Sequence, residues 1–333
     1  MTANLNPMPA GKIRFAIIGC GHIGLRHMDF IRANPDCELL AICDSRPIKE
    51  LSPIPFFQDE DELLAQDFDV LVIATPNGLH ERHALLALRN DRHVLIEKPM
   101  ALTSTGCNNI IREAKARGKQ IFCVMQNRYS APSVWLKSLM EKKALGRIFL
   151  VTLNCFWNRD VRYYHKGSWK GTPDLDGGIL FTQFSHFIDS LLWLFGDIAD
   201  IEAKFANFSH GDSTSFEDTG TAIFNFTQGG MGAFNFTTSV RGQNLESSLT
   251  VIGEKGTVRI GGQYMEKVEV CMLEGIDGGS IGAAATDPRV NHAFIYDNIV
   301  SVLKKGALPD IDPLEAGKVV ETIEKIYSRK KPI

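Results

Sequence analysis

Lys98 is the first residue of this sequence whose type and position point to proton chemistry. It stands in Glu97-Lys98-Pro99, directly after the short apolar run 94–96. A lysine held at the end of a strand beside a positively charged ligand has a lowered pKa, which brings the amine towards a range useful for proton transfer. The alternative is a surface lysine in a turn before proline.

A histidine in the second half of the chain is the other candidate. His186 lies in the stretch 177–196, which begins with two glycines and is otherwise strongly apolar. Read as one helix, this stretch has a polar face whose members are spaced four, three and four residues apart: Thr182, His186, Asp189 and Trp193. Such a stripe needs hydrogen-bonding partners, which a ligand pocket could supply. The alternative is a buried histidine satisfied within the protein.

A glycine-rich turn joins the first apolar run of the chain to the first helical pattern. It reads G-x-G-x-x-G, with Gly19, Gly21 and Gly24 and with His22 and Ile23 between the last two glycines. The first glycine would allow a sharp turn, the second the close approach of a pyrophosphate, and the third close packing of helix on strand. The pattern predicts a dinucleotide whose phosphates lie at a helix N-terminus, where unpaired N–H groups favour negative charge.

An acidic residue follows the second strand-like run, at the position where this kind of fold contacts the adenosine ribose. The run 39–43 ends in Asp44, twenty residues after Gly24. A carboxylate there accepts hydrogen bonds from both ribose hydroxyls and repels a 2′-phosphate, which favours NAD. Ser45 and Arg46 leave NADP open, because a hydroxyl and a guanidinium could hold that phosphate. A solvated strand end is the alternative for Asp44.

The N-terminal part alternates short apolar strands with helical patterns. Strands are predicted over 14–18, 39–43, 70–74, 94–96 and 121–125, and helices over 25–33, 79–89 and 104–117, the last capped by Thr103. This alternation predicts a doubly wound parallel sheet covered on both faces. Ligands of such sheets lie beyond the carboxyl ends of the strands. The residues at these ends, besides Glu97 and Lys98, include Thr75, Pro76, Asn77 and His80.

After about Asn127 the pattern changes. Strand-like stretches punctuated by glycine lie at 222–226, 232–238, 249–252 and 267–273, and helical patterns at 289–304 and 314–329. The longer strands predict a mostly antiparallel sheet with one face packed and one face available.

Composition limits the classes of protein. The chain has 333 residues, 44% of them hydrophobic, which is enough for two domains with cores of their own. Its net charge of −3 offers no general attraction to nucleic acid or to an anionic membrane. Seven cysteines without a C-x-x-C pair indicate a reduced, cytoplasmic setting. No signal peptide and no apolar run of membrane-spanning length are recognised.

Together these motifs resemble the Gfo/Idh/MocA family of oxidoreductases. The resemblance runs from about residue 12 to the C-terminus, and Glu-Lys-Pro combined with the later Gly-Gly…His-x-x-Asp is its most specific part. It implies an N-terminal dinucleotide-binding Rossmann domain, residues 1–128, and a C-terminal α/β domain, residues 129–333, for substrate binding and oligomerisation. The large open, mostly antiparallel sheet of the second domain would support a homodimer or homotetramer.

The resemblance also implies a reaction. It is an NAD(P)-dependent oxidation of a secondary alcohol on a sugar-like substrate held between the domains, with Lys98 and His186 as the catalytic pair. We expect His186 to be the base and Lys98 the orienting and electrostatic partner. Many family members carry Asp, and some Asn, where this chain has Thr182, whose hydroxyl can position a substrate but cannot hold negative charge. The expected cofactor residues are Gly19, Gly21, His22, Ile23, Gly24, Asp44, Ser45, Arg46, Thr75, Pro76, Asn77, His80, Glu97 and Lys98.

The segment 162–171 is similar to one in the nucleotide-sugar branch of the family, whose members oxidise C3 of UDP-N-acetylglucosaminuronate. It offers aromatic faces for a ring and cations, Lys166 among them, for phosphate or carboxylate. The alternative is a solvated basic loop with anchoring aromatics. The expected substrate residues are Lys98, Arg162, Tyr163, Tyr164, Trp169, Lys170, Thr182, His186 and Asp189.

Two other functions remain open. One is a dehydrogenase of a free polyol, inositol or aldose, and the other is a non-catalytic, dinucleotide-binding redox sensor with a protein partner. Thr182 favours the sensor, whereas the presence of both Lys98 and His186 argues against it.

Metal and nucleic-acid sites are not expected. His80 and His83 are three residues apart on a predicted helix, but no acidic or cysteine partner is placed to complete a site, and a surface helix face explains them better. The sequence has no strong basic run that would favour nucleic acid.

Overall fold

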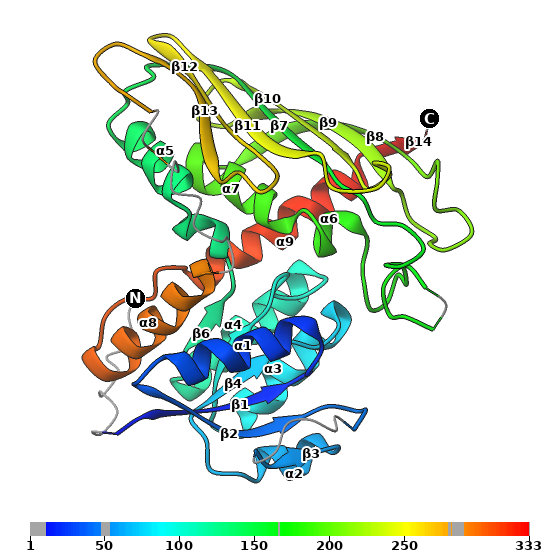
Figure 1. The fold of residues 1–333 in the computed structure, drawn as a ribbon, viewed down its shortest axis with the longest axis vertical. Coiled ribbons are helices and arrows are strands. Elements are labelled where there is room, and N and C mark those ends of the chain that lie inside the picture. The colour runs from blue at the N-terminus through cyan, green and yellow to red at the C-terminus, as the bar shows by residue number, and fades with distance from the viewer. Residues whose placement is uncertain (1–10, 48–53, 166, 279–280, 282–289, 333) are drawn as a thin grey trace. The chain divides into compact units, whose positions relative to one another are not determined.

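The computed structural model describes residues 11–47, 54–165, 167–278, 281 and 290–332. The chain divides into two compact units: unit 1 contains residues 1–125 and 292–320, and unit 2 contains residues 126–291 and 321–333 (Figure 1). The first division lies three residues before the expected boundary after residue 128. The return of residues 292–320 to unit 1 is a feature that two consecutive domains do not predict.

Unit 1 is built on one parallel sheet of six strands, in the order β3-β2-β1-β4-β5-β6. The parallel pairing confirms the doubly wound sheet predicted from the sequence. Its strands are β1 (Ile13–Ile18), β2 (Cys37–Cys43), β3 (Phe56–Phe57), β4 (Val70–Ile73), β5 (His93–Ile96) and β6 (Ile121–Cys123). The edge strand β3 was not predicted, because two residues are too short for a recognisable pattern.

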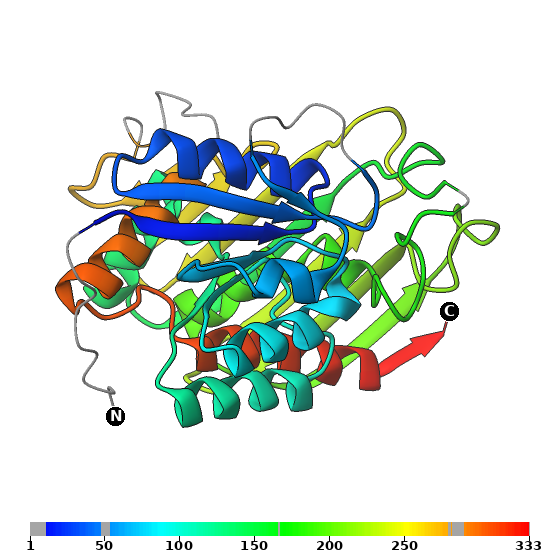
Figure 2. The same cartoon turned by 90° about the horizontal axis from the view of Figure 1, so that it is seen from below.

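Helices cover both faces of this sheet. Figure 2 shows α1 on one face and α3 and α4 on the other. The helices are α1 (His22–Ala33), α2 (Glu60–Leu64), η1 (Asn77–Leu79), α3 (His80–Arg89), α4 (Ser104–Arg117) and α8 (Asn291–Lys305). The Thr103 side chain accepts the Gly106 amide (2.9 Å), which confirms the predicted cap of α4. Helix α1 begins three residues before the predicted start, because the glycine turn itself forms its first turn.

Unit 2 is built on a sheet of eight strands, in the order β13-β12-β11-β7-β10-β9-β8-β14. The pairs β7–β10 and β8–β14 are parallel and the other neighbouring pairs are antiparallel, so the predicted mostly antiparallel sheet is confirmed. Its strands are β7 (Ile148–Phe156), β8 (Ile198–Ala206), β9 (Thr219–Phe226), β10 (Met231–Thr237), β11 (Glu246–Gly253), β12 (Gly256–Gly261), β13 (Lys267–Leu273) and β14 (Lys330–Pro332).

The single helix expected across residues 177–196 is interrupted. Helix α6 (Ile179–Thr182) ends before α7 (Ser185–Phe195) begins, and fully buried Phe184 lies at the break. Its ring packs against Trp157, Phe234 and Phe236 on the inner face of the sheet. Burying this aromatic side chain is favourable enough to outweigh a continuous helix. The described residues also form η2 (Gln126–Tyr129), α5 (Ala131–Glu141) and α9 (Pro313–Ser328), whose second half belongs to unit 2.

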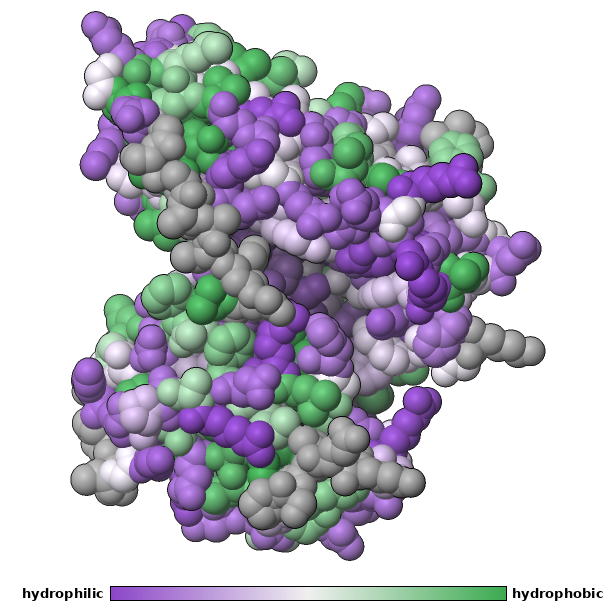
Figure 3. Space-filling view, viewed as in Figure 1, coloured by the Kyte–Doolittle hydropathy of each residue, from purple (hydrophilic) through white to green (hydrophobic). Residues whose placement is uncertain are grey.

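The surface is of mixed polarity. Hydrophilic and hydrophobic residues are interspersed over the face shown in Figure 3. Among the residues that the structure describes, no helix is long and apolar enough to cross a membrane.

One buried histidine makes the stability of unit 1 depend on pH. His93 accepts the backbone amide of Gln120 through Nδ1 (2.9 Å), and burial lowers the pKa of His93 to about 4. The unfolded chain binds a proton near pH 6.5, so folding loses stability as the pH falls from 6.5 towards 4. We predict that His93 lowers the free energy of unfolding by about 2 kcal/mol over this pH range, a value reduced to allow for its partial exposure.

Urea unfolding at a series of pH values tests this prediction. His93→Gln should flatten the pH dependence, whereas replacing exposed His165 by Gln should leave it unchanged. If the free energy of unfolding of His93→Gln depended on pH as strongly as that of the wild type, other groups would be responsible for the loss of stability in acid.

Candidate active site

The three glycines of the turn between β1 and α1 meet different requirements. Gly19 has φ +91°, and a Cβ there would lie 2.6 Å from the backbone of Ala74. A Cβ on Gly24 would overlap the carbonyl oxygen of Gly19. At Gly21, in contrast, a Cβ would meet nothing within 4 Å. The turn is therefore closed against the protein at Gly19 and Gly24 and open at Gly21, which leaves the space that a pyrophosphate needs.

The N-terminus of α1 is uncapped by any side chain. Gly21 is its N-cap residue, no side-chain hydrogen bond caps it, and its first turn contains no acidic residue. The first N–H groups of a helix need acceptors, and phosphate oxygens can provide them. His22 and Ile23 lie in this first turn, where exposed His22 contacts Arg26 through Nε2 (3.0 Å).

Asp44 is fixed against the glycine turn. Its Oδ2 accepts the backbone amide of Cys20 (2.8 Å), and its Oδ1 accepts that of Arg46 (2.9 Å). Each carboxylate oxygen can accept a second hydrogen bond, so the geometry fits a ribose with two free hydroxyls. Ser45 and Arg46 are both exposed at this position.

His80 holds two loops together. Its Nδ1 lies 2.7 Å from the carbonyl oxygen of Pro99, and its Nε2 lies 2.9 Å from that of Thr75. Burial lowers the pKa of His80. Because both ring nitrogens contact backbone, His80 positions the loops after β4 and β5, and its direct contact with the cofactor stays a prediction. Pro76 and buried Asn77 lie in the first of these loops.

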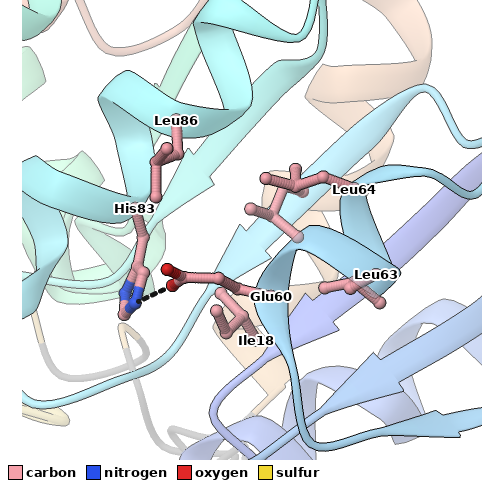
Figure 4. A pocket seen from close by; sticks show the side chains of 7 residues that line it. Ile18, Glu60, Leu63, Leu64, His83 and Leu86 are labelled. Carbon is pink, nitrogen blue, oxygen red and sulfur yellow. Dashed lines mark ion pairs between the residues drawn. The ribbon is translucent and has the colours of Figure 1, made fainter.

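The expectation that His80 and His83 occupy a surface helix face is wrong, because both are buried. His83 contacts the Thr75 hydroxyl through Nδ1 (3.0 Å) and Glu60 through Nε2 (3.3 Å). Figure 4 shows the Glu60 carboxylate pointing at the His83 ring beside an apolar pocket lined by Ile18, Leu63, Leu64 and Leu86. Within the described ranges no group of three or more His, Cys, Asp or Glu residues is arranged to hold a metal ion.

Lys98 is positioned through the residue before it. The buried Glu97 accepts the backbone amide of Lys98 through Oε2 (3.1 Å) and contacts His27 Nε2 through Oε1 (2.9 Å). His27 Nδ1 in turn contacts the hydroxyl of Tyr296 on α8 (2.8 Å). Burial raises the pKa of Glu97, but the hydrogen bond and charge of His27 oppose it and the result is about 2.

Both oxygens of Glu97 therefore have partners within unit 1, and a contact with the cofactor stays a prediction. His27 and Tyr296 were missed by the sequence analysis. They lie 269 residues apart, and no local pattern connects them.

In unit 2, His186 lies in the first turn of α7 and is buried. Its Nε2 lies 2.8 Å from Nε2 of Gln126, in η2. In the same short helix Arg128 donates to Asp189 through Nε (2.9 Å) and Nη2 (2.5 Å), and its guanidinium carbon lies 5.6 Å from the Trp193 ring centroid. The polar face of α7 is therefore contacted by η2 at His186 and Asp189, and a substrate contact of Asp189 stays a prediction.

Gln126 and Arg128 are the site residues that the sequence analysis missed in unit 2. Their position gave a signal, because they follow directly on the last strand of the parallel sheet. The buried partner, Asp189, could be identified only from the structure.

Thr182 does not extend the face that carries His186. Its hydroxyl donates to the backbone carbonyl oxygen of Asp176 (3.0 Å) and to the Asp176 carboxylate, which also accepts the Gly171 amide (2.7 Å). Because the helix is interrupted after Thr182, this residue fixes the preceding loop, and the expected spacing of four residues along one helix does not apply.

The segment 162–171 is divided between anchoring and accessible residues. Arg162 is exposed and paired with Asp160 (2.6 Å), and Tyr164 is buried with its ring 5.3 Å from His210. Tyr163 is half-buried and accepts a hydrogen bond from Gln183 (2.6 Å). Trp169 and Lys170 are also half-buried, whereas Lys166 lies outside the described residues.

A parallel sheet with an open glycine turn and an acid at the ribose position defines a dinucleotide-binding oxidoreductase domain. Residues 13–125 match the model of the "Oxidoreductase family, NAD-binding Rossmann fold", and residues 134–259 match the "GFO/IDH/MocA C-terminal domain". The chain belongs to the GFO/IDH/MocA family of oxidoreductases, and unit 1 contains its NAD-binding Rossmann fold.

The chain is similar to several dehydrogenases. The structure of the WlbA dehydrogenase from Bordetella pertussis in complex with NADH and UDP-GlcNAcA is 33% identical, with a TM-score of 0.92, over 97% of this chain and 96% of that one. Scyllo-inositol 2-dehydrogenase (NADP(+)) IolU of Bacillus subtilis is 26% identical over 94% of this chain and 96% of its own. D-glucoside 3-dehydrogenase of Escherichia coli is 28% identical over 57% of this chain and 56% of its own length. Several other curated relatives likewise match over little more than half of their length.

Two glycine variants separate the fold of the turn from its ligand. Gly21→Ala places a methyl group in open space at an ordinary φ of −70°, so we predict unchanged thermal stability but about tenfold weaker NADH binding. Gly24→Ala forces a methyl group onto the Gly19 carbonyl oxygen and should destabilise unit 1 by about 1–3 kcal/mol. Thermal unfolding and NADH fluorescence titration measure the two effects. Wild-type NADH affinity in Gly21→Ala would contradict the assignment of the open space.

Proposed function

We propose that this chain oxidises the C3 hydroxyl of a UDP-N-acetylhexosaminuronate with NAD as oxidant. The observation that carries the proposal is the similarity over almost the full length of the chain to the WlbA dehydrogenase bound to NADH and UDP-GlcNAcA. The half-buried Tyr163 and Lys170 of unit 2 add support, because an aromatic face and a cation suit a sugar ring that carries acidic groups.

The cofactor residues of the proposal are those that fit the dinucleotide in unit 1. The open turn at Gly21 and the first N–H groups of α1 would hold the pyrophosphate, and Asp44 the ribose. When bound, NAD supplies a hydride acceptor. The exposed Arg46 next to Asp44 keeps NADP as a second possibility for the same position.

His186 is the proposed base. In the tautomer that accepts a hydrogen bond from Gln126, Nε2 carries the lone pair, and this lone pair becomes the base when the substrate hydroxyl replaces Gln126 as the donor to Nε2. The ring would take the proton of the C3 hydroxyl, and bound NAD would supply the acceptor for the hydride of the C3–H bond. The products are a 3-keto sugar, NADH and a proton.

Lys98 is the proposed orienting partner. Its backbone amide is fixed by Glu97, and its side chain is half-buried. An ammonium group that donates to the C3 oxygen stabilises the negative charge that develops as the proton leaves.

Two substitutions test this assignment. Lys98→Met and His186→Ala should each slow hydride transfer by about 10²–10⁴-fold, because each removes one proton-transfer or charge-stabilising group. Exposed Lys115→Met and His165→Ala serve as matched controls and should react like the wild type. Single-turnover absorbance of reduced nicotinamide with NAD and UDP-GlcNAcA measures the rate, and full turnover in both Lys98→Met and His186→Ala would refute the catalytic pair.

The substrate panel decides between the proposed function and its alternatives. Turnover of inositols or aldoses without turnover of the nucleotide sugar would favour the second candidate, which the similarity to IolU supports. NADH binding without turnover of any sugar, together with a stable protein partner, would favour the redox sensor.

We also propose that the chain forms a homodimer or homotetramer through the outer face of the unit 2 sheet. The outward positions of β7, β9 and β10 carry no charged residue. Three large side chains are exposed on these strands or on the neighbouring β11: Ile223 by 52%, Met231 by 59% and Ile252 by 38%. Uncharged, partly apolar faces of this kind suit contact with a second copy.

Introducing positive charge on this face should therefore dissociate the oligomer. Ile223→Lys combined with Met231→Lys should give a monomer by light scattering, since two ammonium groups would have to be desolvated in the interface. Phe208→Lys, at an exposed loop residue, is the control and should leave the mass unchanged. A monomeric wild type would contradict the proposal.

A further inference from the structure

Arg159, which follows β7 in unit 2, is a half-buried cation with neutral partners. Its Nε donates to Oε1 of Gln183 (2.7 Å), and its Nη1 donates to the backbone oxygen of Asn158 (2.6 Å) and to Oδ1 of Asn244 (3.1 Å). Within the part of the chain that the structure describes, Arg159 forms no ion pair. The comparison with Arg128, which is paired with Asp189, shows that unit 2 compensates one buried guanidinium and leaves another uncompensated.

A second cation lies close to Arg159. The Lys170 Nζ is 3.9 Å from the Tyr163 ring centroid, and the Arg159 guanidinium carbon is 5.2 Å from the same centroid. Burial and then the charge of Arg159 lower the pKa of Lys170, while Asp176 opposes them. The Asp176 carboxylate already accepts bonds from the Gly171 amide and the Thr182 hydroxyl. The surroundings of Tyr163 therefore carry an excess of positive charge.

Gln183 ties this positive region to the segment that carries His186. Its Oε1 accepts from Arg159, and its Nε2 donates to the hydroxyl of Tyr163 (2.6 Å). Gln183 lies only three residues before His186, between α6 and α7. An anion held by Arg159 would thus be fixed relative to the proposed base by short contacts within one unit.

We propose that Arg159, together with Lys170, binds an oxyanion of the substrate. The inference rests on the proposed function and names the group that unit 2 recognises, either the sugar carboxylate or the diphosphate. Nη2 of Arg159 carries two N–H groups that none of the three hydrogen bonds to Gln183, Asn158 and Asn244 uses. A guanidinium held in this way presents a planar pair of donors that suits carboxylate or phosphate.

An oxyanion site at Arg159 would also select against uncharged polyols. An anionic substrate would neutralise the positive charge of Arg159 and Lys170. An inositol or aldose would displace water from these cations without supplying a negative charge. Arg147, an exposed arginine of unit 2 that is paired with Glu254, is the matched control.

Calorimetric binding to NADH-loaded protein tests the inference. The ligands are UDP-GlcNAcA, UDP-GlcNAc, which lacks the carboxylate, and free glucuronate, which lacks the diphosphate. Arg159→Gln should weaken binding of UDP-GlcNAcA by about 10- to 100-fold, and Arg147→Gln by less than about twofold. If the carboxylate is the bound group, Arg159→Gln also weakens glucuronate and spares UDP-GlcNAc. If the diphosphate is bound, it weakens both nucleotide sugars and spares glucuronate.

The outcomes separate this inference from the proposed function. The inference would be overturned if Arg159→Gln bound all three ligands with wild-type affinity. It would also be overturned if none of the three ligands bound to the wild-type protein. Binding of glucuronate alone, lost in Arg159→Gln, would support the oxyanion site while refuting the nucleotide-sugar substrate. If Arg159→Gln fails to fold, Lys170→Met decides, since unchanged affinity for UDP-GlcNAcA in that variant would also overturn the site.

Discussion

A buried carboxylate is the constraint around which unit 1 is arranged. Glu97 lies in the interior, where an uncompensated negative charge would be too costly, so its two oxygens must find donors. They find them in His27 of α1 and in the backbone amide of Lys98, and His27 is itself held by Tyr296 of α8. The hydrogen bonds that satisfy Glu97 thereby connect α1, the end of β5 and α8, which comes from the C-terminal part of the chain.

This arrangement explains why residues 292–320 belong to unit 1. Tyr296 is fully buried, with its ring 5.5 Å from that of Phe15 in β1, and His292 stacks on Phe30 of α1 at 5.6 Å. Helix α8 therefore completes the cover of the sheet on the side of α1. The position of Lys98 thus depends on packing between segments at opposite ends of the sequence.

Two arginines of unit 2, Arg128 and Arg159, have different hydrogen-bonding partners. Arg128 is neutralised by Asp189 and lies over Trp193, so that η2 is locked onto α7 and Gln126 is brought to His186. Arg159 has the same kind of surroundings, near Trp157 and Tyr163, but amide and carbonyl oxygens replace the carboxylate. The first arrangement is complete within the protein and has a structural role. The second leaves the guanidinium among neutral acceptors, which is the physical basis of the proposal that Arg159 binds an anion.

The sequence by itself determined the parallel sheet, the mostly antiparallel sheet and the glycine turn, because these depend on local periodicity and on glycine positions that a short stretch of chain reveals. Only the tertiary structure decided the partners of the site residues: Glu97 with His27, Asp189 with Arg128, and Thr182 with Asp176. It also interrupted the helix before His186, since burial of Phe184 against the sheet outweighs a continuous helix. Hydrogen-bond pairing and ring packing connect residues that are distant along the chain, and local pattern contains no information about which distant group will satisfy a buried charge.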